Sequence, residues 1–149
     1  MALETAQFLN FEQKTIQTPC GLFGKGVILK RNPILVSVYR AGLSILDTYR
    51  NFFVGAPCGF LGVKRNEESE QAEPQMYYSN LPLMSSDDKI IILETMLATG
   101  GSAGMAILEV LKNKNVTPEN IIVVAVICAI DGVERLARIF HESQKNFIK

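Results

Sequence analysis

The chain has 149 residues, a length typical of one domain that buries a sizeable core. Its 15 basic and 15 acidic residues cancel, so no overall field favours nucleic acid or an anionic membrane, and an anion site must be local. The only histidine, His141, lies in a polar C-terminal stretch, which removes histidine-based triads and multi-histidine metal sites from consideration. Three widely separated cysteines argue against a disulfide framework or a zinc site.

Neither a secretory signal nor a membrane span is expected. No basic residue precedes the few apolar residues of 1–10, as a secretory signal would require. The longest apolar run, 121–130, is too short to cross a bilayer. We therefore expect a soluble cytoplasmic protein with reduced cysteines and with no nucleic-acid or membrane partner.

The first strand-to-helix unit is expected after a weakly patterned arm, 1–31, that contains one edge strand. The β-branched run 34–39 predicts a strand, and a helix is expected at 43–52. Between them, the Arg40-Ala41-Gly42 turn could be only a tight connection with a solvated arginine. A permanently charged arginine at the end of a strand is also suited to binding phosphate.

A hairpin is expected next. Residues 59–63 predict a strand and 75–81 its return strand. The polar run 67–74 between them lacks apolar periodicity. It therefore indicates a solvated hairpin tip rather than a metal site.

In the middle of the chain, a strand runs directly into a glycine turn and a helix. The four branched apolar residues 90–93 are typical of a parallel strand that is buried on both faces. Apolar residues then recur at helical spacing from Ala103 to about Lys112, so 99–102 should form the N-terminus of a helix. Unpaired N–H groups and the helix dipole make such an end an anion site, which Gly100 and Gly101 would let a phosphate approach. The plainer alternative is an ordinary turn with a threonine cap.

The last strand and helix complete the pattern. Residues 121–130 predict a second strand buried on both faces, after which Asp131 should cap a helix with Glu134 completing a capping box. The inner face of this helix is expected to carry Val133, Leu136, Ala137 and Phe140. Residues 142–149 should form a polar tail.

These elements together predict an α/β fold, an open parallel sheet with helices on both faces. We expect one domain over 1–149, made of an arm at 1–31, a core at 32–141 and the tail.

Three strings, in the same order along the chain, resemble the uracil phosphoribosyltransferases, which are type I phosphoribosyltransferases. The family signature Asp-Pro-Met-Leu-Ala-Thr-Gly-Gly-Ser is matched without change at 96–102, but Glu94 and Thr95 replace its Asp-Pro. Arg-Ala-Gly-Leu at 40–43 resembles the family's pyrophosphate loop. Arg-Asn-Glu-Glu at 65–68 resembles a string on its mobile β-hairpin. The similarity covers about 2–140.

The resemblance implies transfer of the phosphoribosyl group of 5-phosphoribosyl-1-pyrophosphate (PRPP) to uracil, which gives UMP and pyrophosphate. Glu94 would be the catalytic residue and would bind the ribose hydroxyls, while Arg40 and Arg65 would take the pyrophosphate. Mg²⁺ would arrive with PRPP rather than at a dedicated protein site. The partners implied are PRPP, a pyrimidine base or nucleotide, and a second copy in a homodimer. The PRPP-binding residues implied are Arg40, Gly42, Arg65, Glu94, Thr95, Met96, Leu97, Ala98, Thr99, Gly100, Gly101 and Ser102.

Two departures from the family bear on activity. The chain is expected to lack the family's usual N-terminal arm and the C-terminal hood that recognises uracil, so base specificity has the least support. Glu94 also carries its carboxylate one methylene farther out than aspartate, and a misplacement of about 1 Å can cost on the order of a hundredfold in rate.

Three hypotheses follow: a transferase, a catalytically impaired PRPP- or nucleotide-binding module with a regulatory or interaction role, and a scaffold that has lost the ligand. Arg40, Arg65 and the Thr-Gly-Gly turn at 99–101 argue against the scaffold.

Overall fold

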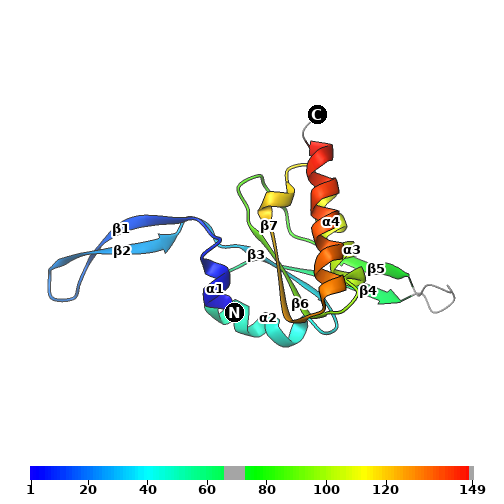
Figure 1. Ribbon diagram of the computed structural model, residues 1–149. Helices are drawn as coiled ribbons and strands as arrows, with labels where there is room; N and C mark the ends of the chain where they lie inside the picture. The colour runs from blue at the N-terminus through cyan, green and yellow to red at the C-terminus, as the bar shows by residue number, and fades with distance from the viewer. Residues whose placement is uncertain (66–72, 148–149) are drawn as a thin grey trace.

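A five-stranded sheet in the order β5-β4-β3-β6-β7 lies at the centre of the structure, a computed structural model that describes residues 1–65 and 73–147 (Figure 1). Strand β5 is antiparallel to β4, and the other neighbouring strands run parallel. The strands are β3 (Ile34–Tyr39), β4 (Cys58–Arg65), β5 (Pro74–Asn80), β6 (Ile90–Leu97) and β7 (Ile121–Cys128).

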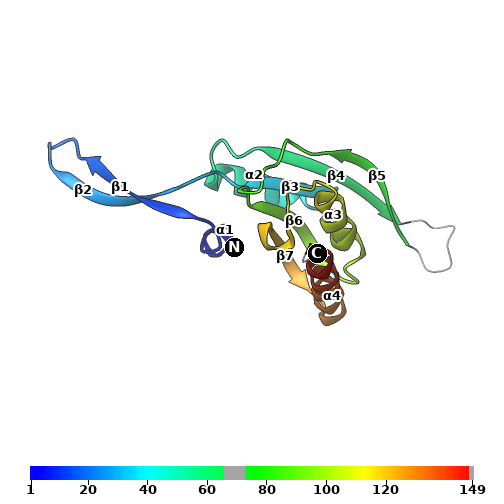
Figure 2. The same ribbon diagram turned by 90° about the horizontal axis from the view of Figure 1, so that it is seen from above.

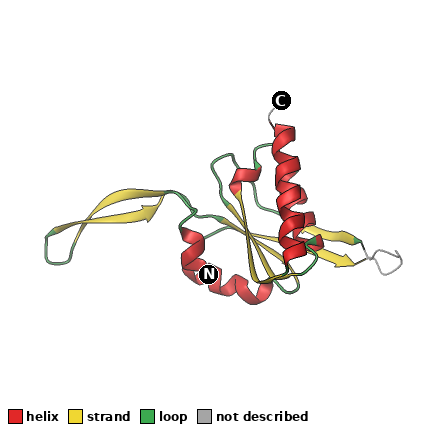
Figure 3. Ribbon diagram, viewed as in Figure 1, coloured by secondary structure: helices red, strands yellow, loops and turns green. Residues whose placement is uncertain are grey.

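Helices cover both faces of this sheet, as Figure 3 shows. Side chains of α1 (Ala2–Ala6) and α2 (Leu43–Phe52) pack in one core with alternate residues of β3 and β6. Helices α3 (Gly101–Leu111) and α4 (Ile130–Phe147) pack on the other face. The predicted α/β architecture is confirmed, with one antiparallel strand added at an edge. Within the described ranges, none of the helices is both long and apolar enough to cross a bilayer.

Strand β6 is the most deeply buried element of the sheet. Its first four residues are fully buried because β3 and β7 flank them and helices cover both faces. The strand is longer than the predicted 90–93, since its parallel pairing with β7 continues as far as Leu97 and Cys128. Thr95, Met96 and Leu97 are therefore strand residues, and the turn contains only Ala98 to Gly100.

The prediction that the second apolar strand is buried on both faces was wrong. Only Ile121 of β7 is buried, and the strand becomes exposed from Val126 onward. The physical reason is position, because β7 is an edge strand of the sheet over the described residues. Its apolar run reflects β-propensity as much as burial.

Helix α4 differs from its prediction at both ends. It begins at Ile130, so Asp131 lies within its first turn instead of capping it. Leu136 is buried as expected, but Val133 and Ala137 are exposed, and Ile139 and Phe140 complete the inner face. Residues 142–147, expected in a polar tail, continue the helix.

The first 31 residues contain more structure than the loose arm that was predicted. After α1, strands β1 (Phe11–Gln17) and β2 (Phe23–Leu29) form an antiparallel two-stranded sheet. Figures 1 and 2 show this hairpin extending away from the central sheet. All seven residues of β1 are exposed. The predicted tip of the other hairpin, 67–74, falls largely outside the described residues, and Pro74 already belongs to β5.

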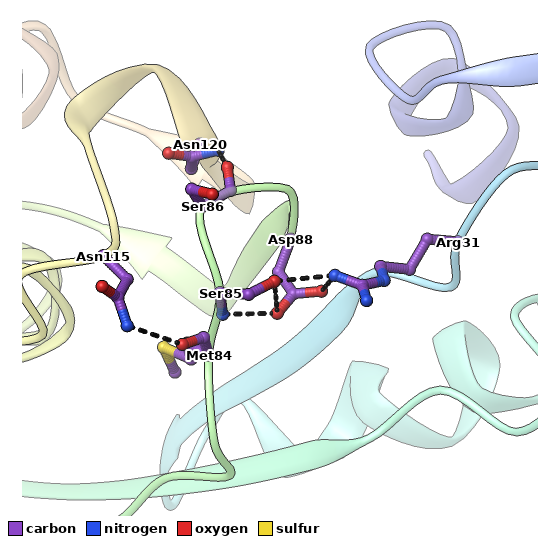
Figure 4. A network of polar contacts seen from close by, with 7 residues as sticks. All are labelled: Arg31, Met84, Ser85, Ser86, Asp88, Asn115 and Asn120. Carbon is purple, nitrogen blue, oxygen red and sulfur yellow. Dashed lines mark hydrogen bonds and ion pairs between the residues drawn. The ribbon is translucent and has the colours of Figure 1, made fainter.

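A polar network holds the loop that precedes β6 (Figure 4). Asp88 accepts hydrogen bonds from the backbone N–H of Ser85 at 2.7 Å and from Arg31 at 2.9 Å. The Asn120 side-chain amide donates to the Ser86 carbonyl oxygen at 3.0 Å. These contacts hold the amino end of β6 in place. The glycine turn follows at its carboxyl end.

Candidate functional site

A cleft of about 350 Å³ opens at the carboxyl end of β6, where the strand meets the glycine turn. Ligands of open α/β sheets generally bind outside the carboxyl ends of the strands. The lining residues come from the β4–β5 hairpin, β6, the turn, the start of α3, and α4: Arg65, Glu73, Pro74, Glu94, Met96, Leu97, Ala98, Thr99, Gly100, Gly101, Ser102, Ala103 and Arg135.

The turn depends on glycine at one position in particular. Gly100 has a φ of 73°, a left-handed conformation that side chains other than glycine's seldom tolerate. A Cβ atom at Gly100 would lie 2.9 Å from the Gly132 carbonyl oxygen. Gly101 has no positive φ, and a Cβ there would lie 3.4 Å from Cγ of Pro74. Of the two predicted glycines, Gly100 shapes the backbone and Gly101 leaves room in the cleft.

The N-terminus of α3 faces this cleft and has no side-chain cap. Gly100 is the N-cap residue, and no side chain in the described part of the chain caps this end, so the alternative of a threonine cap is not realised. Ser102 and Ala103, in the first turn, line the cleft together with Gly101. The first N–H groups of a helix lack partners within the helix and carry the positive end of its dipole. This end therefore offers donors to an anion in the cleft.

Glu94 places a buried carboxyl group in the same cleft. The residue is only 7% exposed, and its Oε1 accepts a hydrogen bond from the Thr95 backbone N–H at 3.0 Å. Burial raises the pKa of the Glu94 carboxyl, and backbone hydrogen bonds from Thr95 and Met96 partly oppose that shift. The carboxyl group is thus costly to ionise until a ligand brings it polar partners.

Two arginines give the cleft a local positive charge. Arg65 ends β4, and Arg135 comes from α4, with its Nη1 atom 3.7 Å from the position of a Cβ on Gly101. Neither guanidinium has an ion-pair partner within 4.0 Å among the residues the structure describes. The chain is neutral overall, so this pair supplies the expected local anion site.

Sequence reasoning missed Arg135, and also the lining residues Glu73, Pro74 and Ala103. The available signal for Arg135 was its spacing of three residues from Gly132, which puts both on one face of α4. The spacing alone does not show that this face of α4 points at the cleft; the packing of Gly132 against the turn does. A Cβ on Gly132 would lie 2.6 Å from the Ala98 carbonyl oxygen, so α4 and the turn meet backbone to backbone.

Three predicted binding residues do not line the cleft. Arg40 is exposed just beyond β3, where the peptide bond joining Tyr39 to it is cis. Gly42 is buried, and a Cβ there would overlap the Leu93 carbonyl oxygen, so this glycine permits close packing of β3 and α2 against β6. Thr95 is half-buried within β6. The structure brings the other predicted residues together.

The described residues of the cleft do not form a metal site by themselves. Across 1–65 and 73–147, no group of three His, Cys, Asp or Glu side chains could hold a metal ion. Among the described residues, the lining contributes the carboxyl groups of Glu73 and Glu94. A hard divalent cation favours six or more oxygen ligands, so it would depend on oxygens that a ligand brings.

Comparison with known proteins identifies the family to which the chain is similar. The family model for uracil phosphoribosyltransferase matches residues 1–145. The chain is 34% identical over 142 residues to the uracil phosphoribosyltransferase of Aquifex aeolicus, covering 95% of this chain and 65% of the relative. It is 33% identical over 138 residues to that of Malacoplasma penetrans, covering 93% of this chain and 64% of the relative. The chain thus spans slightly less than two thirds of the length of these curated relatives.

Solved structures agree with this assignment. A protein of known structure from Aquifex aeolicus superposes with a TM-score of 0.78 at 34% identity, over 95% of this chain and 65% of that one. An adenine phosphoribosyltransferase from Trypanosoma brucei shares the fold at 10% identity, with a TM-score of 0.55 over 76% of this chain and 50% of its own. The family match over nearly the whole chain, together with the glycine turn at 99–101, shows that the chain belongs to the uracil phosphoribosyltransferase family.

Proposed function

We propose that the chain binds PRPP in the cleft and transfers its 5-phosphoribosyl group to uracil, which yields UMP and pyrophosphate, in pyrimidine salvage in the cytoplasm. One observation carries the proposal: the uncapped N-terminus of α3, the buried Glu94 carboxyl and two arginines line a single cleft. PRPP carries phosphate groups at both ends of a ribose. A site for PRPP therefore needs hydrogen-bond donors for phosphate on either side of a group that binds the sugar hydroxyls.

The residues divide between the parts of PRPP. Backbone N–H groups at 101–103, with the hydroxyls of Thr99 and Ser102, bind the 5′-phosphate. The Glu94 carboxylate accepts hydrogen bonds from the ribose hydroxyls. Arg65 binds the pyrophosphate, and Arg40 approaches it from the end of β3, the strand beside β6.

The reaction needs stabilised charge rather than a protein nucleophile. The N1 atom of uracil forms a bond to ribose C1 and releases its proton to solvent, while the C1–O bond breaks and its electron pair leaves with pyrophosphate. Positive charge develops on the sugar and negative charge on the leaving group. In this proposal Glu94 stabilises the first charge and Arg65 the second, which is supported by both residues lining the cleft. Mg²⁺ belongs to the substrate in this scheme, bound by the pyrophosphate oxygens.

A second candidate function is a catalytically impaired module that binds PRPP or a nucleotide and acts by regulation or interaction. The geometry of Glu94 favours it, because this carboxylate folds back onto the N–H of the next residue. This bond holds the Oε1 atom of Glu94 against its own backbone and restricts how the carboxylate can turn toward a ribose. Binding would survive while turnover falls.

The chain is also proposed to form a homodimer. A two-stranded hairpin alone is marginally stable in water, and this one exposes Phe11, Ile16, Phe23 and Val27. A second copy of the chain is the occupant that covers this apolar surface in the proposal. Sedimentation equilibrium tests it, and a monomer at all concentrations contradicts it.

The two candidate functions separate in a turnover assay. UMP formation is followed from labelled uracil and PRPP with Mg²⁺, for the unmodified chain and for Glu94→Asp. We expect weak turnover that Glu94→Asp increases, since the shorter side chain cannot fold back in the same way. Binding of PRPP with no UMP from either protein supports the binding module.

A further inference from the structure

Arg135 reaches the N-terminus of α3 from a different helix. Its Nη1 atom lies 3.7 Å, and its Cβ atom 3.4 Å, from the positions that Cβ atoms would take on Gly101 and Gly100 respectively. The guanidinium is therefore beside the first residue of α3. Arg65 also lines the cleft, at the last residue of β4, where it pairs with Pro74 of β5.

The packing of α4 fixes this position. The backbone of Gly132, one turn before Arg135, lies so close to the turn that a Cβ would come within 2.8 Å of the Leu97 carbonyl oxygen. Farther along, Ile139 packs over Gly104, where a Cβ would lie 2.6 Å from its Cδ1. These two contacts, one before and one after Arg135, hold α4 in place and restrict the position of the Arg135 backbone.

Arg135 lies beside the positive end of the α3 helix dipole. A cation beside the positive end of a helix dipole is repelled, and the first turn of α3 contains no acidic residue to compensate. Arg135 has no ion-pair partner within 4.0 Å in the described part of the chain. A doubly charged phosphate between the helix end and the guanidinium would satisfy both groups together.

We propose that Arg135 binds the 5′-phosphate of the phosphoribosyl ligand, as a side-chain clamp that closes over the backbone site at the start of α3. This inference rests on the proposed function and adds a residue to it. It also assigns the two arginines of the cleft to opposite ends of PRPP: Arg135 to the 5′-phosphate and Arg65 to the pyrophosphate.

Calorimetric titration with each half of the ligand tests this assignment. Ribose 5-phosphate and, separately, pyrophosphate with Mg²⁺ are titrated into the unmodified chain, Arg135→Gln, Arg65→Gln and Arg138→Gln. Arg138 lies on α4, is exposed and does not line the cleft, so it is the matched control for loss of one positive charge. Unchanged melting temperatures verify that the variants are folded.

We expect Arg135→Gln to weaken ribose 5-phosphate binding at least tenfold and to change pyrophosphate binding less than twofold. Arg65→Gln should show the reverse pattern, and Arg138→Gln should match the unmodified chain. Arg135→Lys should recover part of the affinity, because it keeps the charge but loses the paired hydrogen bonds.

The outcomes separate this inference from the proposed function. If the unmodified chain and Arg135→Gln bind ribose 5-phosphate equally well, Arg135 has no such role and the proposed function stands. If Arg135→Gln and Arg138→Gln weaken binding equally, the effect is general charge and the clamp is contradicted. If the unmodified chain binds neither ligand, the proposed function fails and this role fails with it.

Discussion

Gly100 and Gly132 pack backbone to backbone, with the position of a Gly100 Cβ 2.9 Å from the Gly132 carbonyl oxygen. The contact joins the turn after β6 to the first residues of α4. Neither glycine could carry a side chain without moving the turn, α4 or both. The shape of the anion site and the position of Arg135 therefore depend on the same contact.

Gly100→Ala should destabilise the protein and weaken PRPP binding. A left-handed backbone costs a residue with a Cβ about 1–2 kcal/mol, and the contact with Gly132 adds to this. Urea unfolding measures the loss of stability, and titration calorimetry measures binding. A variant as stable as the unmodified chain, with unchanged binding, would mean that the turn tolerates a side chain.

Gly101→Val should abolish PRPP binding and leave the fold largely formed. Its backbone needs no positive φ, so the expected effect comes from the side chain, which fills the cleft between Pro74 and Arg135. Titration with PRPP measures the loss, and circular dichroism verifies the fold. Gly24→Val, at a position with open space on β2, is the control and should bind normally. Normal binding by Gly101→Val would show that phosphate does not approach this residue.

Glu94→Gln should stabilise the protein at neutral pH. The folded-state pKa of Glu94 is raised above its usual 4.5, so the folded chain holds this proton more tightly than the unfolded chain does. Its contribution to stability is therefore fully present below pH 4.5 and is lost as the pH rises above that value. Glutamine does not ionise, so the variant should keep this stability at neutral pH. Urea unfolding of both proteins between pH 4 and pH 8 measures the difference, and equal profiles would contradict the role of burial.

Ser37→Ala should increase stability by about 1 kcal/mol, the lower end of the cost of a buried unsatisfied polar group. Ser37 is fully buried in β3, and its hydroxyl group has no hydrogen-bond partner among the described residues. Urea unfolding measures the change. Leu35→Ala, two residues earlier and equally buried, is the contrasting control and should cost about 2–5 kcal/mol. A loss of stability in Ser37→Ala would reveal a partner for the hydroxyl, such as a bound water.

Much of the sheet could be predicted from local pattern. The bounds of β3 and α2 are as expected, because a β-branched run and a helical period are visible within six and ten residues. Burial of β7 was overestimated because an apolar β-branched run looks the same in a central and in an edge strand. The N-terminal hairpin was missed because β1 is exposed along its whole length and the alternate residues of β2 are only partly buried, so neither strand carries a strong apolar alternation.

Part of the candidate site could likewise be predicted from the sequence, and part could not. The glycine turn and its helix are contiguous in the chain, so their anion site was readable from 90–102 alone. Arg135 was not, because its role depends on how α4 packs on the turn more than 30 residues earlier in the sequence. Asp131 does not cap α4, because the helix begins one residue before it, at Ile130. The preceding residue, Ala129, donates its N–H to the Leu97 carbonyl oxygen.

The central claim is that the cleft beside Glu94 and Gly101 binds PRPP. Titration calorimetry with PRPP and Mg²⁺, followed by uracil, tests it most directly, with melting temperature as the second readout. We predict saturable binding at one site per chain, a rise in melting temperature and weaker binding in Arg65→Gln. At a hundredfold excess over its dissociation constant, the ligand should add about 2.7 kcal/mol to the free energy of unfolding. No binding heat and no rise in melting temperature at millimolar PRPP would contradict the account.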